Sequence, residues 1–356
     1  MSDFLVKRGD LRECRIAESV VPAPEDGQVL LRVERFGMTA NNVTYGVMGE
    51  AMSYWDFFPA EEGWGRVPVW GFAEVERSDA AGVEAGTRVF GYLPPSSHLL
   101  VTPVRADERG FVDGSPHRES LPSAYHRYLA TGADPFYAAD TEDMQMLLRP
   151  LFFTSFLIDD QLYDDGLTAR GPIVFSSASS KTAIAAAFLL SQRQGVEVIG
   201  LTSPRNAEFV AGLGVYSLCV TYDAIDSLPP GPASFVDFAG DGAVRQAVHT
   251  HYGDGLASST AVGFTHWEDA EAGDGTLAGP SPTFFFAPDR VNKRSADWGR
   301  AQLEQRVAGA WHPFCEWIAE RLDVVHREGF EGLRTAYLDV LEGRVDARTA
   351  HVISLG

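Results

Sequence analysis

Apolar and polar residues alternate along the N-terminal part of the chain. Gln28–Phe36 (QVLLRVERF) changes character at almost every position, which is typical of a strand with one buried face. Val67–Val75 and Thr87–Tyr92 are further short apolar runs, and they are separated by turn residues. Many short strands with Gly- and Pro-containing turns predict a β-rich barrel or sandwich.

The middle of the chain alternates strand and helix patterns instead. Short apolar runs that predict strands occur at Pro172–Ser176, Val196–Leu201, Ser217–Tyr222, Ser234–Phe238 and Ser258–Phe264. Segments with helical character lie between them, at Lys181–Gln192, Arg205–Leu213 and Ala243–Tyr252. This β-α-β order predicts an α/β fold with a doubly wound, Rossmann-like parallel sheet.

Residues 105–145 fit neither pattern and are expected to be an insertion. Asp107–Pro122 is polar and rich in turn residues, so we expect an exposed excursion there. Asp140–Asp164 carries apolar residues at helical spacing, and Pro150 is expected to begin or kink the second of two helices. The C-terminal part predicts helices at Ala301–His326 and Gly329–Gly343 and a closing strand at Ala350–Leu355.

Composition narrows the class of protein. A chain of 356 residues with 45% hydrophobic and 22% charged residues is expected to form two globular domains. Its net charge of −20 repels phosphate backbones and anionic lipids, which argues against nucleic-acid or membrane partners. Its start lacks the apolar core of a signal peptide, so a cytoplasmic location is expected. Cys14, Cys219 and Cys315 are too scattered to predict disulfides or a zinc knot.

The loop after the first strand of the parallel sheet is the candidate phosphate site. A ligand there would meet the N-terminus of the following helix, with hydroxyl donors and one cation beside it. The residues concerned are Ser176, Ser177, Ser179, Ser180, Lys181 and Thr182. A serine-rich cap that merely starts the helix is the alternative. The loop has no glycine, and Ser180 stands directly before Lys181 where a P-loop has glycine, so both standard phosphate-binding fingerprints fail.

The loop after the second strand indicates which dinucleotide would bind. NAD sites usually place an acidic residue there for the ribose 2′-hydroxyl, whereas this loop has Thr202, Ser203 and Arg205. A guanidinium and hydroxyl groups suit a 2′-phosphate, so NADPH is predicted in preference to NADH. A solvated surface arginine is the alternative interpretation of Arg205.

These stretches resemble the cofactor domain of the medium-chain dehydrogenase/reductase superfamily, quinone-reductase branch. The resemblance runs over Gly171–Gly214, Asp237–Gly240 and Val262-Gly263. It implies that Tyr222, near the 2′-phosphate, Gly240 and Gly263 also contact the cofactor. Pro24–Val33 is similar to the opening strand of the superfamily's GroES-like domain. The whole chain also resembles a bacterial subfamily described only as a domain of unknown function.

The resemblance implies a domain order. Residues 1–149 would form the GroES-like substrate domain with its insertion, residues 150–287 the Rossmann-like NADPH-binding domain, and residues 288–356 a segment that returns to the substrate domain. It also implies a homodimer, since the cofactor-domain sheet of the superfamily often pairs across a two-fold axis.

Zinc-dependent members of the superfamily carry a His-Glu pair where this chain has Val69–Glu74, without histidine or cysteine, so a metal-free reductase is expected. Such an enzyme transfers hydride from NADPH to an activated C=C bond, a quinone or a carbonyl compound and then needs a proton donor. Phe36–Gly49 matches the stretch beside the nicotinamide, which makes Tyr45 the first candidate donor and Asn42 an orienting residue.

Other residues remain candidates. Tyr54 and Trp55 lie in an aromatic loop that could roof a pocket, and Lys293 is a second possible donor. Lys293 belongs to a basic cluster with Arg290 and Arg294 that could meet an acidic substrate, a cofactor phosphate or a neighbouring carboxylate. Phe284–Phe286 could line a pocket, although a core or dimer interface is the favoured interpretation.

Two further functions stay open. The missing glycines favour a binding or sensor protein that keeps the fold without turnover, since bulkier residues limit the approach of backbone to a pyrophosphate. A non-redox enzyme that uses the same cleft is the third possibility.

Overall fold

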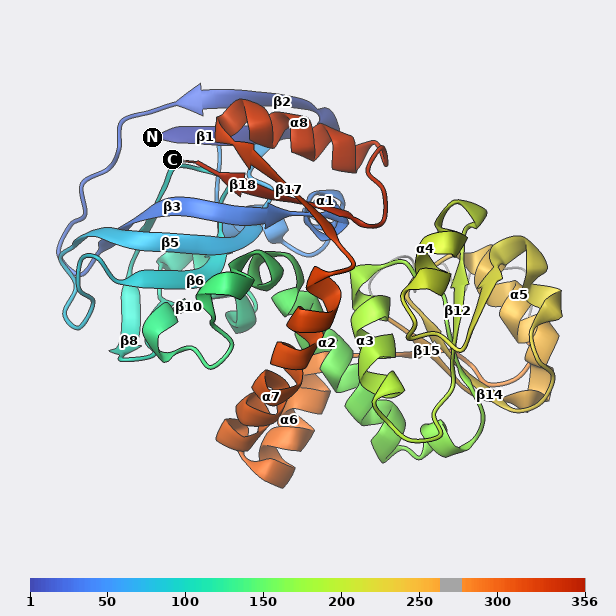
Figure 1. Ribbon diagram of the computed structural model, residues 1–356. Coiled ribbons are helices and arrows are strands. Elements are labelled where there is room, and N and C mark those ends of the chain that lie inside the picture. Colours follow the sequence, from blue (N-terminus) through green and yellow to red (C-terminus); the bar gives the residue numbers. More distant parts are fainter. Residues whose placement is uncertain (263–276, 356) are drawn as a thin grey trace. The chain divides into compact units, whose positions relative to one another are not determined.

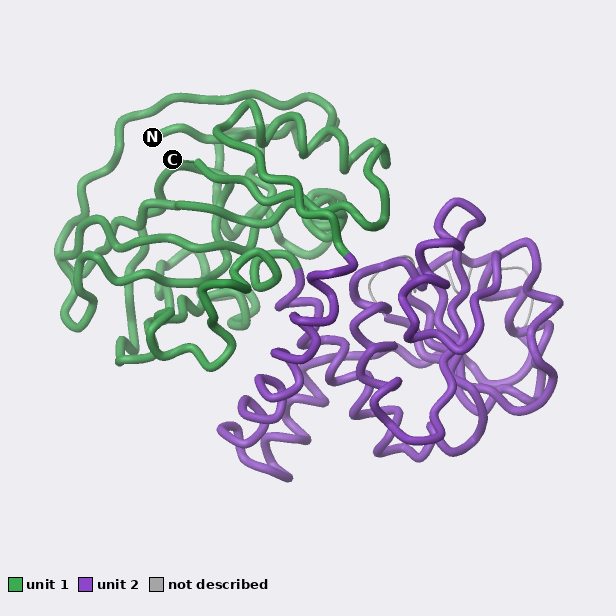
Figure 2. Tube along the Cα trace, in the orientation of Figure 1, with its two compact units in different colours: residues 1–147, 322–356 green, residues 148–321 purple. Residues whose placement is uncertain are grey.

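A computed structural model describes residues 1–262 and 277–355 of the chain. The chain forms two compact units, shown in Figure 2: unit 1 contains Met1–Leu147 and Leu322–Gly356, and unit 2 contains Leu148–Arg321. Each unit therefore has its own core, and the helix α2 (Glu142–Asp164) begins in unit 1 and continues in unit 2.

Unit 1 is built on β-sheets (Figure 1). A small sheet has the order β2-β1-β4, and a larger one has the order β17-β18-β3-β5-β6-β10-β9-β8, with β7 also paired to β3. The strands span β1 Ser2–Lys7, β2 Asp10–Glu18, β3 Val29–Met38, β4 Trp64–Gly65, β5 Val69–Ser78, β6 Arg88–Leu93, β7 His98–Val101, β8 Pro103–Asp107, β9 Gly110–Asp113, β10 Arg127–Ala130, β17 Asp323–Glu328 and β18 Thr349–Ser354. The helices are α1 (Ala40–Val47) and α8 (Gly329–Leu341).

The core of unit 1 explains the alternating pattern of its strands. Val29, Leu31 and Val33 of β3 are buried on one face of the strand. They belong to one apolar cluster with Leu333 and Tyr337 of α8, which joins the C-terminal helix to the N-terminal strands.

The insertion is part of the sheet, which corrects one prediction. Asp107–Pro122 was expected to be an exposed excursion, but β8, β9 and β10 extend the large sheet through this region. Asp113 and Arg118 are buried with an Nε–Oδ2 distance of 3.1 Å, and Arg118 lies over the ring of Phe58 at 4.7 Å. Asp113 and Arg118 are therefore buried as an ion pair, whereas Asp107, Glu108 and Glu119 of the same segment are exposed, as the sequence predicts.

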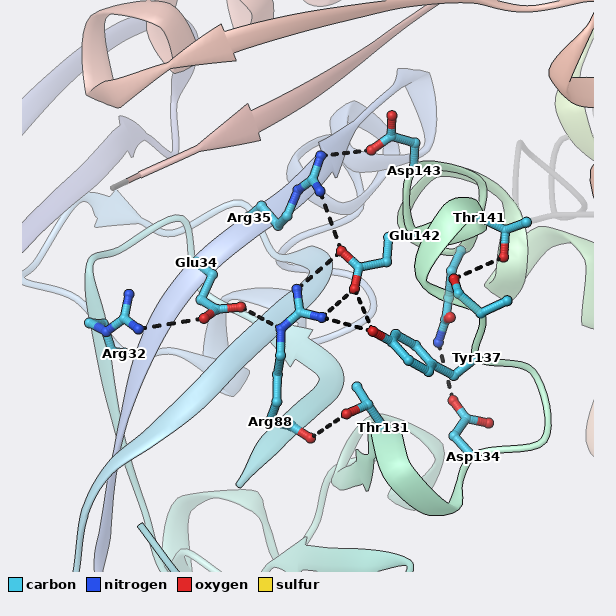
Figure 3. Close-up of polar contacts among 12 residues, drawn as sticks. Arg32, Glu34, Arg35, Arg88, Thr131, Asp134, Tyr137, Thr141, Glu142 and Asp143 are labelled. Carbon is cyan, nitrogen blue, oxygen red and sulfur yellow. Dashed lines mark hydrogen bonds and ion pairs between the residues drawn. The ribbon is translucent and has the colours of Figure 1, made fainter. Parts of the chain in front are cut away.

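Charged side chains hold the start of α2 against the sheet of unit 1, as Figure 3 shows. Arg88 of β6 binds Glu34 at 2.7 Å and also Glu142, the first residue of α2, which in turn accepts from Arg35 of β3 at 3.3 Å. The Tyr137 hydroxyl donates to Glu142 at 2.9 Å. Burial opposes the charge of Glu142, but the hydrogen bonds from Arg88 and Tyr137 lower its pKa. The insertion is thus tied down by ionised groups where it leaves the sheet.

Unit 2 contains the predicted parallel sheet. In the described residues its order is β13-β12-β11-β14-β15-β16, that is, 3-2-1-4-5-6 in chain order, the order of a Rossmann fold. The strands span β11 Ile173–Phe175, β12 Val198–Thr202, β13 Leu218–Thr221, β14 Ala233–Asp237, β15 Leu256–Ala261 and β16 Thr283–Phe284. The helices are α2, α3 (Lys181–Ser191), α4 (Ala207–Gly212), α5 (Gly242–Tyr252), α6 (Ala287–Trp298) and α7 (Arg300–Ala319). The α/β prediction is confirmed.

Helix α3 is apolar all round because it is covered on more than one side. All its residues from Ala183 to Leu190 are buried. Phe188 packs on Phe314 and Trp317 of α7 with ring centroids 5.4 and 5.0 Å apart. The helix α7 therefore belongs to unit 2 and completes the burial of α3.

The C-terminal region differs from its prediction in two respects. The chain returns to unit 1 at Leu322 and not at residue 288, because α6 and α7 pack on elements of unit 2. The helix expected over Ala301–His326 ends at Ala319, and His326 lies in strand β17.

The region Asp140–Asp164 is one helix with Pro150 inside it, where two helices were expected. No described helix has the length and apolar character that a membrane crossing needs.

The first loop of the parallel sheet packs tightly on strand β12. A Cβ atom added at Gly200 would lie 2.8 Å from the Cβ of Ala178 and 3.0 Å from the ring of Tyr216. The Tyr216 hydroxyl also donates to the carbonyl of Ala178 at 2.8 Å. The glycine that allows close packing here is thus on the strand, whereas a standard Rossmann loop carries it in the loop.

This contact predicts a coupled pair of substitutions. We expect Gly200→Ala to destabilise the protein by about 1–3 kcal/mol, since overpacking forces neighbours apart. Adding Ala178→Gly should recover part of that loss, measured as the free energy of unfolding by chemical denaturation of the two single variants and the double variant. Strictly additive effects would contradict the packing described here.

Candidate functional site

The carboxyl ends of β11 and β14 form the site of unit 2. These adjacent strands run parallel, and the chain leaves them in opposite directions across the sheet, toward β12 and β15. In open α/β sheets such a switch point is where ligands bind. Two loops meet there, residues 176–180 after β11 and residues 238–241 after β14.

A buried carboxylate joins the two loops. Asp237, 1% exposed, accepts the Ser176 hydroxyl at 2.7 Å and the backbone N–H groups of Ala239 and Gly240 at 3.1 and 3.0 Å. Its other oxygen accepts from Arg245 of α5, with Nε at 2.9 Å. The Ser176 oxygen also accepts backbone N–H groups of the β14 loop. Ser176 is therefore engaged beneath the loop, and the carboxylate fixes the shape of both loops.

The remainder of the first loop keeps a tight turn without glycine. Ser177 has a left-handed backbone with φ of 48°, and its N–H donates to the Tyr222 hydroxyl at 2.9 Å. Ser180 caps α3, because its hydroxyl accepts from the N–H of Ala183 at 3.3 Å. Lys181 and Thr182 form the first turn of that helix, where backbone N–H groups have no intrahelical acceptors. The sequence-predicted loop residues are thus brought together at a helix N-terminus.

The loop after β12 lies next to the first loop. Asn206 donates to the hydroxyl of Ser179 at 3.0 Å, which links the two loops directly. Arg205 is exposed and Ser203 is half-buried, whereas Thr202 is only 1% exposed and ends the strand. Residues 203–206 (Ser-Pro-Arg-Asn) carry no carboxylate. Gly240 lies in the β14 loop with φ of 65°, and Gly263 lies outside the described residues.

Tyr45 of unit 1 is the centre of an aromatic cluster. Its ring contacts those of Tyr54, Tyr92 and Tyr125 with centroids 4.7, 5.4 and 6.5 Å apart. Its hydroxyl accepts two hydrogen bonds, from the amide of Asn41 at 2.9 Å and from the indole N–H of Trp70 at 3.1 Å. Burial raises the pKa of Tyr45 to about 12, although both hydrogen bonds act to lower it. The phenol is therefore neutral at physiological pH.

A second hydroxyl of the cluster lacks a partner. Tyr92 is fully buried, and its hydroxyl finds no hydrogen-bond partner in the described part of the chain. Burial raises the pKa of this tyrosine, so its hydroxyl is also neutral. A buried hydroxyl without a partner is costly, and a bound polar group would relieve that cost.

Asn42 and Asn41 have different surroundings on α1. Asn42 is 4% exposed, and its side chain accepts the N–H of Thr39 at 2.8 Å and donates to the carbonyl of Pro68 at 3.0 Å. It forms the capping box that starts the helix, so its amide is used within the protein. Asn41, which sequence reasoning missed, is the residue that contacts Tyr45. The spacing i, i+4 on a helix could have identified it.

Lys293 lies in unit 2, among carboxylates. Its ammonium is 2.8 Å from Asp297 and 3.2 Å from Asp164. Arg290 and Arg294 are buried and bind Asp160 of α2 with Nε–Oδ2 distances of 2.5 and 2.7 Å. The basic cluster therefore meets neighbouring carboxylates, one of the alternatives considered from the sequence, and fastens α6 to α2.

The aromatic candidates divide between core and surface. Trp55 is 2% exposed and fills the space beside Gly49 and Gly65, where any added Cβ would overlap its ring, so it is a core residue. Phe285 is buried, whereas Phe284 and Phe286 are 38% and 49% exposed. Trp70, Asp237 and Arg245 are site residues that sequence reasoning left without a role.

Among the residues that the structure describes, no three or more His, Cys, Asp or Glu side chains are grouped so that they could hold a metal ion.

Comparison with known proteins identifies the family of the chain. A family model described as "Protein of unknown function (DUF2855)" matches residues 36–346. A search of the curated proteins finds no significant match.

Solved structures match along the whole chain. CurA from Vibrio vulnificus in complex with NADPH is 14% identical with a TM-score of 0.59, over 100% of this chain and 99% of CurA. Glucose dehydrogenase from Haloferax mediterranei, in complex with NADP, Zn and gluconolactone, is 12% identical with a TM-score of 0.60 and the same coverage. The quinone oxidoreductase from Coxiella burnetii is 13% identical with a TM-score of 0.58, again over 100% and 99%.

These similar structures are medium-chain dehydrogenase/reductases, which confirms the resemblance inferred from the sequence at the level of the fold. The chain is a member of the DUF2855 family, and its fold is the Rossmann-like and GroES-like pair of the medium-chain dehydrogenase/reductase superfamily.

Proposed function

We propose that the protein is an NADPH-dependent, metal-free oxidoreductase that reduces an activated C=C bond, a quinone or a carbonyl compound. The observation that carries this proposal is the switch point of the parallel sheet, where the N-terminus of α3 meets a second loop that carries Arg205 and no carboxylate. CurA, which has this fold, was solved with NADPH, and the Coxiella burnetii relative is a quinone oxidoreductase.

The residues at the switch point fit a dinucleotide phosphate. The first turn of α3 offers backbone N–H groups and the positive end of the helix dipole, and Lys181 adds a charge. Ser177, Ser179 and Ser180 carry hydroxyl groups that can donate where a glycine-rich loop would offer only backbone. Ser203 and Arg205 would hold the 2′-phosphate, together with Tyr222, whereas Thr202 is buried at the end of β12. Ser176 acts indirectly, because its hydroxyl binds Asp237.

When bound, NADPH supplies a hydride. The reduced substrate then has to receive a proton. Tyr45 is assigned the proton transfer, since it is a neutral phenol with its oxygen held by two donors. Asn42, the expected orienting residue, has its amide occupied by the backbone of Thr39 and Pro68.

A nucleotide sensor without turnover is the second candidate. The first loop lacks glycine, and Ser177 holds a left-handed conformation there. Side chains therefore project where glycines would let a pyrophosphate approach the backbone. Binding of NADPH without reduction of any acceptor would select this candidate.

Cofactor preference is the first test. We expect Arg205→Ala to weaken NADPH binding about tenfold or more and to leave NADH binding unchanged, because only NADPH carries the 2′-phosphate and a charge-assisted hydrogen bond contributes about 1.5–3 kcal/mol. Titration followed by nicotinamide fluorescence measures both constants. Arg300→Ala is the control, a substitution of the same kind at a 75% exposed side chain of unit 2. If neither nucleotide binds the unaltered protein, the proposed function is wrong.

The proton donor is the second test. Tyr45→Phe should lower kcat by roughly 10²–10⁴-fold, the usual contribution of general acid catalysis, with little change in KM or in the affinity for NADPH. A panel of enones, quinones and aldehydes gives the substrate for the assay. Tyr163→Phe, at a 59% exposed tyrosine, is the matched control and should change nothing. An unaltered rate in Tyr45→Phe removes Tyr45 from the mechanism.

A further inference from the structure

The hydroxyl of Tyr45 has an unusual hydrogen-bond arrangement. A phenol oxygen has one O–H to donate and lone pairs that accept. The indole N–H of Trp70 can only donate, and the amide of Asn41 is placed with its nitrogen toward the phenol. The two neighbours therefore use the acceptor side of the oxygen and leave its proton for another acceptor.

From this geometry we infer that Trp70 and Asn41 are positioning residues, which together hold the Tyr45 hydroxyl as a proton donor to the substrate. The inference rests on the proposed reductase function, and it adds residues to the reaction that neither the sequence pattern nor the proposed cofactor site contains. The pair of N–H groups is called the Tyr45 cradle below.

The cradle comes from separate elements that are each fixed in place. Asn41 lies one helical turn before Tyr45 on α1, and the start of α1 is held by the capping box of Thr39 and Asn42. Trp70 lies on β5 and stacks on Phe90 of the adjacent strand β6 at 5.9 Å. Because the two donors occupy the acceptor side of the phenol oxygen, the cradle restricts the direction of the O–H bond.

The reaction would use the cradle in one step. Hydride addition to the substrate leaves an enolate or alkoxide that holds the new electron pair. The O–H bond of Tyr45 then breaks, its proton goes to the reduced substrate, and the bonding electrons stay on the Tyr45 oxygen as a phenolate. Trp70 and Asn41 donate to that phenolate, and hydrogen bonds to an ionised group are about twice as strong as those to a neutral one. A proton from solvent restores the phenol.

The surroundings make this stabilisation necessary. The rings around Tyr45 are those of Tyr54, Tyr92 and Tyr125, which offer no positive charge. Burial among them raises the pKa of Tyr45, and the cradle is what opposes that rise. Without the two N–H groups the phenolate would be left in a largely apolar cluster, which is unfavourable.

The test replaces each donor while it keeps the shape of the site. Trp70→Phe retains a ring for the stack on Phe90, and Asn41→Leu retains the side-chain volume. We expect each variant to lower kcat about tenfold with KM unchanged, since one hydrogen bond to a charged group is lost. Trp64→Phe is the control, because Trp64 stacks on Arg15 at 4.2 Å away from the cluster. Thermal melting within a few degrees of the wild type shows that each variant folds.

A second measurement needs neither cofactor nor substrate. Site-specific incorporation of 3,5-difluorotyrosine at position 45 gives a more acidic phenol, whose pKa can be read by ¹⁹F NMR. Trp70→Phe and Asn41→Leu should each raise that pKa by about one unit, the equivalent of a tenfold change, and Trp64→Phe should leave it unchanged. A folded Trp70→Phe variant with an unshifted pKa overturns the cradle. A lowered pKa in Asn41→Leu would mean that its amide accepts from the phenol, and would remove Asn41.

The two measurements distinguish a failure of the cradle from a failure of the proposed reductase function. Turnover that survives Tyr45→Phe overturns the role of the cradle in proton transfer and leaves the reductase function standing. Absence of NADPH binding overturns the reductase function, and with it the proton transfer, even where the pKa shifts are found. Loss of kcat in the Trp70 and Asn41 variants together with both pKa shifts supports the inference in full.

Discussion

The carboxylate of Asp237 is the constraint on which the candidate cofactor site depends. An ionised group that is 1% exposed is tolerated only when it is paired and hydrogen-bonded, and Asp237 has both kinds of partner. It accepts from Arg245 of α5, from Ser176 after β11 and from the backbone of its own loop. Because these partners come from different elements, the carboxylate can be satisfied only when β11, β14 and α5 stand in their observed order. The shape of the switch point follows from that requirement.

The same constraint explains how the first loop dispenses with glycine. With Ser176 held below the loop, the chain turns at Ser177 in a left-handed conformation that costs a non-glycine residue roughly 1–2 kcal/mol. The Tyr222 hydroxyl accepts the Ser177 N–H, and Ala178 packs against Gly200, so the surroundings oppose relaxation of the turn. The close packing thus relies on Gly200 of the neighbouring strand, and hydroxyl groups occupy the loop.

The sequence predicted those parts of the fold that depend on the local pattern of apolar and polar residues. The parallel sheet follows from apolar runs separated by helices, and strands β11, β12 and β14 were placed within a few residues. The prediction failed where contacts between residues far apart in the sequence determine the structure. Asp113 and Arg118 look like solvated residues of a polar segment, but they bury each other, and the stack of Arg118 on Phe58 is a contact between residues 60 positions apart. The end of α7 was missed because Val324 and Val325 continue the apolar pattern of the helix. These two residues belong instead to strand β17, which pairs with β18.

The adjacent asparagines of α1 illustrate the same limit at the candidate active site. Asn41 and Asn42 are chemically identical, and only their positions on the helix distinguish them. Asn42 faces the start of the helix and closes its cap, whereas Asn41 faces Tyr45 one turn later. The cap holds the helix in place, so Asn42 contributes to the geometry of Tyr45 without touching it. Burial and donation then act on the phenol in opposite directions: burial keeps its proton on, and the N–H groups of Trp70 and Asn41 hold the charge that remains when the proton leaves. A phenol between these two effects is suited to donate a proton in a single step, because it stays neutral until an acceptor with a new electron pair is beside it.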